Sequence, residues 1–147
     1  MEQLDLEARS LSSRYGIRLL REELRLFLNI VPESIQNRAS WFSTTNISLH
    51  RITLEIKEHS PLTVTDSILE KINRLRREGL KLAIDDSGSG HHSLRLIDLL
   101  NQDFQKLDKL ITNDSSDRTL KSMVSFCKES DISLIAEGVK SNKHWNA

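Results

Sequence analysis

The sequence has a single cysteine, Cys127, and no excess of charge of either sign. One cysteine excludes an internal disulfide framework and a cysteine-based zinc site, and it fits a reducing compartment. Lysine plus arginine and aspartate plus glutamate each number 21, so no global field would steer the chain toward nucleic acid or a membrane surface. No apolar run approaches the roughly 20 residues that span a bilayer, and the N-terminus is not that of a signal peptide. We therefore expect a cytoplasmic protein with neither nucleic acid nor membrane as a partner.

What is present is enough for one globular domain. The chain has 147 residues, of which 37% are apolar and 29% charged. The apolar share is somewhat below the usual one but still typical of a globular rather than a disordered chain. We expect a single domain over residues 1–147.

Strand-like and helix-like segments alternate along the chain. Short apolar or β-branched runs predict strands, and apolar residues spaced three and four apart predict helices between them. Helical crossovers between strands are almost always right-handed and give a parallel sheet, so the sequence predicts an α/β fold with about five parallel strands. The predicted strands cover residues 24–31, 51–56, 80–86, 104–108 and 132–139, and the predicted helices residues 3–22, 65–78, 93–100 and 114–130.

Each predicted strand carries polar residues at its C-terminal end. In a parallel sheet these ends meet at one edge, where α/β proteins place their chemistry. Taken singly, Asn29 would also fit a satisfied core amide, and Asp108 a cap or a salt bridge. The strand-end residues are Asn29, Glu55, Asp85 with Asp86, Lys106 with Asp108, and Glu137.

The adjacent aspartates Asp85 and Asp86 are the strongest signal, because they lead directly into a loop that contains Gly88 and Gly90. Two neighbouring carboxylates repel each other and need a cation or several donors to stay ionised. The glycines let the backbone turn tightly or approach a ligand closely. Carboxylate and amide oxygens suit magnesium, manganese or calcium better than zinc, and two such ions would activate a water and clamp a phosphodiester. Lys106 would neutralise phosphate charge or hold that water.

Five segments resemble, in order, the motifs of the EAL domain, the cyclic-di-GMP phosphodiesterase domain of bacterial signalling. Residues 27–30 (FLNI) are similar to its V-N-L-S strand and residues 54–58 (LEIKE) to its L-E-I-T-E segment. Residues 84–94 (IDDSGSGHHSL) resemble its L-D-D-F-G-T-G-Y-S-S-L loop. Residues 103–108 (DFQKLD) resemble D-Y-L-K-I-D, and residues 135–140 (IAEGVK) resemble I-A-E-G-V-E.

The resemblance implies hydrolysis of cyclic-di-GMP to pGpG on a (β/α) barrel, with Mg²⁺ or Mn²⁺ in a two-metal site. By the same resemblance, Lys106 and Glu137 hold or deprotonate the attacking water, and Glu58 steadies the loop that carries Gly88 and Gly90. His91 and His92 stand where tyrosine and serine are usual, and we interpret them as exposed loop residues. The implied metal ligands are Asn29, Glu55 and Asp85 for one ion and Asp86 for the second, with Asp108 near the metals.

The sequence also departs from the family pattern. No Glu-Ala-Leu tripeptide occurs, although its glutamate is a metal ligand in the family, and nothing matches the family's closing strand. Lys140 replaces the last acid of E-G-V-E, and Ser87 replaces the loop phenylalanine. We therefore expect a partial, TIM-like (β/α) barrel, a single incomplete EAL domain whose first and last barrel strands are missing.

These departures lead to expectations about function. A metal site short of one anionic ligand binds divalent ions weakly, so we expect weak or no independent hydrolysis. Open sheet edges favour self-association or pairing with a partner chain. The alternatives are a non-catalytic module that binds cyclic-di-GMP or another protein, and a truncated fragment without a function of its own.

Overall fold

The structure is a computed structural model that describes residues 11, 15–30, 48–57, 65–87, 97, 99–108 and 117–139, except for the side chains of residues 86, 87 and 117. The chain divides into two compact units, which are described separately. The first comprises residues 1–55 and 61–81, and the second residues 56–60 and 82–147. Within the described residues, no helix is long and apolar enough to cross a membrane.

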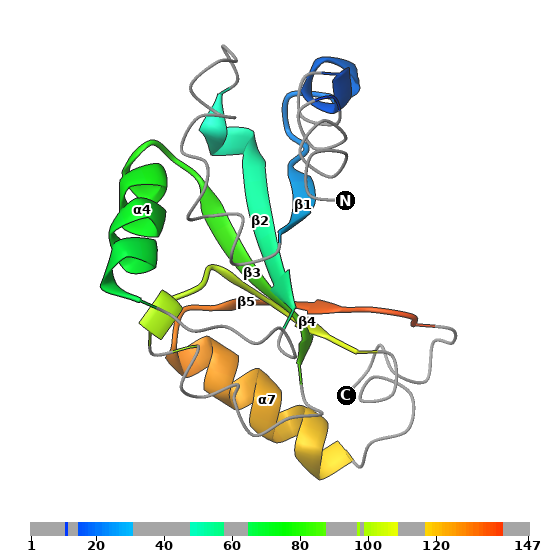
Figure 1. Cartoon of the computed structure of the whole chain (residues 1–147). Coiled ribbons are helices and arrows are strands. Elements are labelled where there is room, and N and C mark those ends of the chain that lie inside the picture. Colours follow the sequence, from blue (N-terminus) through cyan, green and yellow to red (C-terminus); the bar gives the residue numbers. More distant parts are fainter. Residues whose placement is uncertain are drawn as a thin grey trace. The chain divides into compact units, whose positions relative to one another are not determined.

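Five strands form one sheet in which the spatial order follows the order along the chain (Figure 1). This confirms the predicted α/β class with five parallel strands and flanking helices. The elements are β1 (Leu26–Ile30), a 3-10 turn η1 (Leu49–Arg51), β2 (Ile52–Lys57), α4 (Asp66–Arg77), β3 (Lys81–Ser87), β4 (Phe104–Leu107), α7 (Asp117–Glu129) and β5 (Ser133–Ala136).

Strand β2 is almost completely buried. Its residues 52–56 are all buried, with at most 5% of any of them exposed. Side chains alternate along a strand, so Ile52 and Leu54 share one face while Thr53 and Glu55 share the other. Burial on both faces is typical of an inner strand of a parallel sheet, although Thr53 and Glu55 make one buried face of β2 polar.

Helix α4 begins and ends at signals that are visible in the sequence. Thr65 is the N-cap, and its Oγ1 accepts a hydrogen bond from the Ile68 amide at 3.4 Å. Ile72, one turn further on, is buried with Ile68. Gly79 ends the helix with φ +97, and the Leu80 amide donates to the Leu75 carbonyl as in a Schellman motif. Threonine is a common N-cap residue and glycine a common residue after a helix C-terminus, so both ends of α4 follow from local residue preferences.

The N-terminal helical segment exposes the face that its apolar spacing defines. Residues 11 and 15–19 are helical. Leu11 is 52% exposed, Tyr15 61% and Leu19 84%. Among the residues that the structure describes, nothing covers this apolar stripe. The guanidinium of Arg51 donates to carbonyl oxygens that follow this segment, those of Leu20 at 3.0 Å and Arg21 at 2.6 Å.

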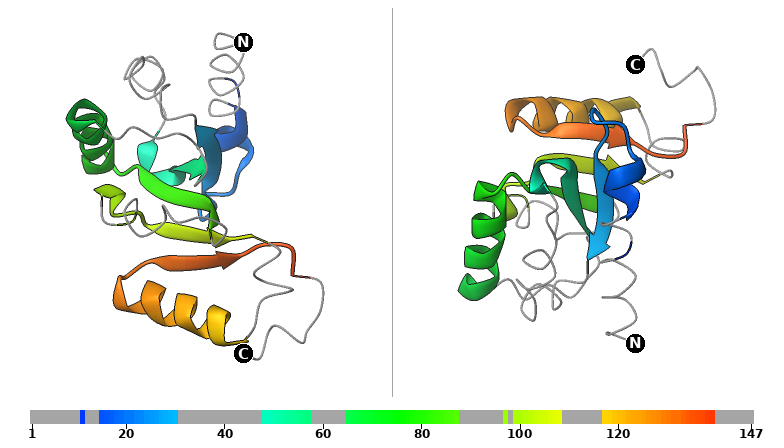
Figure 2. Two further views of the ribbon diagram at one scale, coloured as in Figure 1. Left: turned by 60° about the horizontal axis from the view of Figure 1, so that its bottom comes forward. Right: turned by 90° about the horizontal axis from the view of Figure 1, so that it is seen from above.

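The second unit is built on the parallel strands β3, β4 and β5. Helix α7 packs against β5 (Figures 1 and 2), and its Cys127 is 1% exposed. Burial raises the pKa of the Cys127 thiol because the thiolate loses its hydration. Strand β5 pairs with β4 in unbroken register from Phe104 opposite Ser133 onward. The pairing of β3 with β4 is interrupted, and the interruption falls at the candidate site.

Candidate catalytic and metal site

The second unit places three predicted site residues on one face of its strands. Asp85 lies on β3, Lys106 on β4, and Glu137 directly after β5. Residues two apart share a face of a strand, and Lys106 is paired with Ile135, two residues before Glu137. The opposite face of β4 carries Gln105 and Leu107, which are almost fully buried. Lys106 can therefore reach both carboxylates without entering the apolar layer.

Lys106 forms ion pairs with both carboxylates. Its Nζ lies 3.1 Å from Oδ1 of Asp85 and 2.7 Å from Oε1 of Glu137. The side chains of Lys106 and Asp85 are only 13% and 11% exposed, whereas that of Glu137 is 40% exposed. The ammonium thus holds a buried carboxylate on one side and a water-accessible carboxylate on the other.

The Asp85 carboxylate has spare capacity as a ligand. Its Oδ1 is buried and, despite the ion pair, accepts no hydrogen bond of good geometry. The Lys106 ammonium is therefore its charge partner rather than a well-aligned donor, and a buried carboxylate oxygen of this kind has the chemistry of a ligand for a hard cation. Asp85 therefore fits the predicted divalent ion in donor type. Among the residues that the structure describes, no group of three or more histidine, cysteine or carboxylate side chains is arranged to hold an ion.

A backbone irregularity lies at the aspartate pair. Ile84 is opposite Gln105, but the next matched pair is Ser87 opposite Leu107. Two residues of β3, Asp85 and Asp86, therefore face a single residue of β4. Such a bulge is common beside active sites, where it re-aims a side chain. In the sequence, the bulge has no local signal other than the glycines that begin two residues after Asp86.

The remaining predicted site residues are distributed over the rest of the chain. Glu55 is 5% exposed on the polar face of β2, and Asn29 is exposed on β1; both belong to the first unit. Asp108 is partly buried just after β4. The metal set therefore stays a prediction. Outside the described residues lie Glu58, Gly88, Gly90, His91, His92 and the side chain of Asp86.

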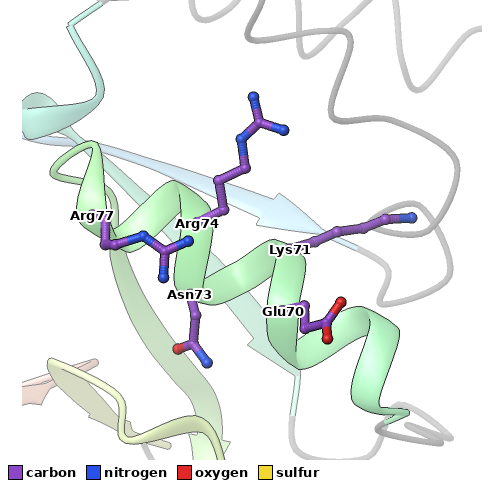
Figure 3. A pocket seen from close by; sticks show the side chains of 5 residues that line it. All are labelled: Glu70, Lys71, Asn73, Arg74 and Arg77. Atoms are coloured by element: carbon purple, nitrogen blue, oxygen red, sulfur yellow. The ribbon is translucent and has the colours of Figure 1, made fainter.

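A separate hollow of about 430 Å³ lies along α4 in the first unit. Figure 3 shows Lys71 and Arg74 extending away from the helix in different directions, while Arg77 runs along it toward Asn73. Glu70 completes the described lining, and none of these residues is buried. Because the charges are mixed and exposed, the hollow lacks the enclosed polar groups that fix a ligand.

Comparisons with known proteins agree with the motifs. The family model of the EAL domain matches residues 6–147. The chain is 34% identical over 144 residues to the cyclic di-GMP phosphodiesterase PdeA of Borreliella burgdorferi, and 28% identical over 149 residues to the cyclic di-GMP phosphodiesterase RocR of Pseudomonas aeruginosa. These alignments cover 90% and 94% of this chain but only 21% and 38% of the two relatives.

The fold is likewise similar to solved structures. A complex of Klebsiella pneumoniae BlrP1 with manganese and cyclic di-GMP superimposes with a TM-score of 0.84 and 25% sequence identity. The match covers 98% of this chain and 40% of that one. The chain therefore corresponds to part of a longer relative in each comparison.

Proposed function

The chain belongs to the EAL domain family, and from this premise we propose that its site binds cyclic-di-GMP and serves metal-dependent hydrolysis of that phosphodiester. The position of Lys106 between Asp85 and Glu137 is the observation that carries the proposal. The identity of the named relatives, both cyclic di-GMP phosphodiesterases, supports it.

Asp85, Lys106 and Glu137 differ in exposure to water, and we assign their roles on that basis. Glu137, at 40% exposure, is open to a water molecule and would accept its proton as it attacks phosphorus. Lys106, whose ammonium also contacts Asp85 and Glu137, would attract the phosphate by its charge and help to hold this water. The ion pair with Asp85 fixes the ammonium in place, because both side chains are largely withdrawn from water.

A bound magnesium or manganese ion would polarise the phosphoryl oxygen and lower the pKa of the attacking water. Asp85 fits this ion in donor type, because its carboxylate is buried and its Oδ1 is held by the charge of Lys106 rather than by a well-aligned hydrogen bond. Asn29, Glu55 and Asp86 complete the proposed ligand set, and Glu58, Asp108, Gly88 and Gly90 are proposed to support it.

We expect slow or undetectable hydrolysis by these 147 residues alone, because they contain no Glu-Ala-Leu segment to supply a further carboxylate ligand. The second candidate is a module that binds cyclic-di-GMP without cleaving it. The Lys106 ion pairs also favour this role, since a fixed ammonium binds a phosphate with or without catalysis. We also propose that the protein is cytoplasmic and that its sheet edges pair with a second copy or with a partner chain.

Calorimetry with cyclic-di-GMP in the presence of Mn²⁺, Mg²⁺ or a chelator tests the proposal, with chromatography of the nucleotide to detect pGpG. We expect binding that needs the ion and that Lys106→Met weakens at least tenfold. Glu137→Gln should keep binding and reduce any hydrolysis by about 10²–10⁴-fold, the usual contribution of a general base. Lys121→Met, an exposed lysine on α7, is the matched control and should change neither quantity.

Two results would count against the proposal. Absence of cyclic-di-GMP binding with either ion would overturn it. Turnover at ordinary enzyme rates, about 1–10³ per second, would leave the assignment standing but refute the expectation of slow hydrolysis.

A further inference from the structure

Asp103, which lies directly before β4, connects the strands β3, β4 and β5. Its Oδ2 accepts a hydrogen bond from the Leu82 amide at 3.0 Å, and its own amide donates to the Leu82 carbonyl at 2.9 Å. Its carbonyl oxygen accepts from the Ser133 amide at 2.9 Å. One residue therefore ties the start of β3 to the start of β4, and the start of β4 to the start of β5.

These contacts lie on the same strands as the site, but at the opposite end. Leu82 precedes Asp85 by three residues on β3, and Asp103 precedes Lys106 by three residues around β4. Ser133 precedes Glu137 by four residues. The three strand starts that Asp103 joins are therefore the starts of the three strands that end in the ion pairs.

Register between β3 and β4 decides whether the ion pairs exist. A slip of β4 by one residue turns Lys106 to the opposite face and brings the buried Gln105 or Leu107 to the polar face. A slip of two residues keeps the face but moves Lys106 by about 6.6 Å along the strand, at about 3.3 Å per residue, which breaks a 3.1 Å contact.

The backbone ladder by itself specifies this register weakly. Every residue offers the same amide and carbonyl, and the bulge after Ile84 interrupts the ladder just before Lys106. The side-chain bond from Leu82 to Asp103 is specific, because the neighbouring residues Gln102 and Phe104 carry no carboxylate. This hydrogen bond lies before the bulge, where β3 and β4 still pair regularly.

We propose that Asp103 is a positioning residue that sets the register of β3, β4 and β5 and thereby places Lys106 between Asp85 and Glu137. Whether this placement of Lys106 serves catalysis depends on the proposed function. The placement itself does not depend on it. The expected consequence is a specific change at Lys106 when the side-chain bond is lost.

The test uses the full chain with Asp103→Ala and Asp103→Asn. Alanine removes the acceptor, whereas asparagine keeps an oxygen in the same place for the Leu82 amide. We expect the hydrogen-exchange protection of the Leu82 amide to fall at least tenfold in Asp103→Ala. Acylation of Lys106 by a water-soluble ester, read by peptide mass spectrometry, should become several-fold faster, because the ammonium leaves its ion pairs. Both quantities should stay near wild type in Asp103→Asn.

A control separates positioning from general loss of stability. Cys127→Ala leaves a cavity beneath α7 and destabilises the second unit without touching Asp103. It should leave the acylation rate of Lys106 unchanged under native conditions. An equal acceleration in Cys127→Ala, or an unchanged rate in Asp103→Ala, would overturn the proposal.

The same variants keep this inference distinct from the proposed function. If wild-type protein does not bind cyclic-di-GMP but the acylation pattern holds, the positioning role stands and the nucleotide assignment fails. If binding is observed and is weakened at least tenfold by Asp103→Ala but not by Asp103→Asn, both stand. Binding that Asp103→Ala leaves intact would overturn the role of the register in the site.

Discussion

Replacing Lys106 with methionine removes the ammonium that lies between Asp85 and Glu137 while nearly keeping the length of the side chain. The two ion pairs allow the effect of the N–O distance to be distinguished from the effect of carboxylate burial. The contact with Glu137 is the shorter, at 2.7 Å against 3.1 Å, but Glu137 is 40% exposed and Asp85 only 11%. Measuring both pairs therefore shows which of the two factors sets their strength.

Coulomb's law with a dielectric constant of about 20 gives about 5 kcal/mol for the Asp85 pair and about 6 kcal/mol for the Glu137 pair. On distance the two are nearly equal. Water screens the exposed carboxylate and keeps solvating it when the partner is lost, whereas the buried one is left uncompensated. After the desolvation cost is subtracted, we expect a coupling of about 2–3 kcal/mol with Asp85 and below about 1 kcal/mol with Glu137.

Double-mutant cycles measure these couplings. Lys106→Met is combined with Asp85→Asn in one cycle and with Glu137→Gln in the other, and the free energy of unfolding is measured in urea by circular dichroism. The exposed pair Arg74 and Glu78 on α4, 3.7 Å apart, supplies a reference cycle that should give about 0.3–0.5 kcal/mol. A coupling with Glu137 that equals or exceeds that with Asp85 would refute the reasoning from burial.

Three further outcomes are expected. Gly79→Ala should lower the free energy of unfolding by about 1–3 kcal/mol, because the residue has φ +97 and a Cβ there would overlap the imidazole of His50; urea titration measures this. Burial raises the pKa of the Cys127 thiol, so the unfolded chain ionises first and stability should fall as the pH rises above about 8.5; denaturation at several pH values measures the slope. The exposed side chains of Leu11, Tyr15 and Leu19 are spaced four residues apart and form one apolar stripe, which can pack against the same stripe of a second copy. Sedimentation should therefore show association that increases with protein concentration, and Leu19→Glu should weaken it.

Each of these outcomes has its own control. His50→Ala in the Gly79→Ala background should recover the part of the loss that comes from overlap, but not the part that comes from φ. Cys127→Ala should remove the dependence on pH in that range, and a persisting slope would assign it to another group. A wild-type chain that stays monomeric over a wide concentration range would contradict the association.

The elements were largely predictable because their signals are local. The Thr65 cap and the Gly79 stop act through hydrogen bonds and dihedral angles within a few residues, so the bounds of α4 followed from the sequence. The strand β2 was predicted because its β-branched residues Ile52, Thr53 and Ile56 favour strands. The exposure of Tyr15 was not predictable, since spacing defines a helical face but not what covers it.

The candidate site was predictable in its residue types and less so in its geometry. Parallel strands gather their C-terminal ends, so Asp85, Lys106 and Glu137 were expected on one side of the sheet. The bulge that sets Asp85 and Asp86 against one residue of β4 depends on pairing with a distant segment, for which a single sequence carries little signal. The link from Asp103 to Leu82 was missed for the same reason.

The sequence by itself therefore determined the class of fold and the chemical character of the strand ends, because periodicity, caps and motifs act over short stretches of chain. The tertiary structure decided which charges meet. Lys106 lies between a buried Asp85 and an accessible Glu137 because three strands from separate parts of the sequence pair side by side, with a bulge in β3 at Asp85 and Asp86. The physical reason is that an ion pair depends on distances of a few ångströms and on burial, and both arise only when the strands pack together.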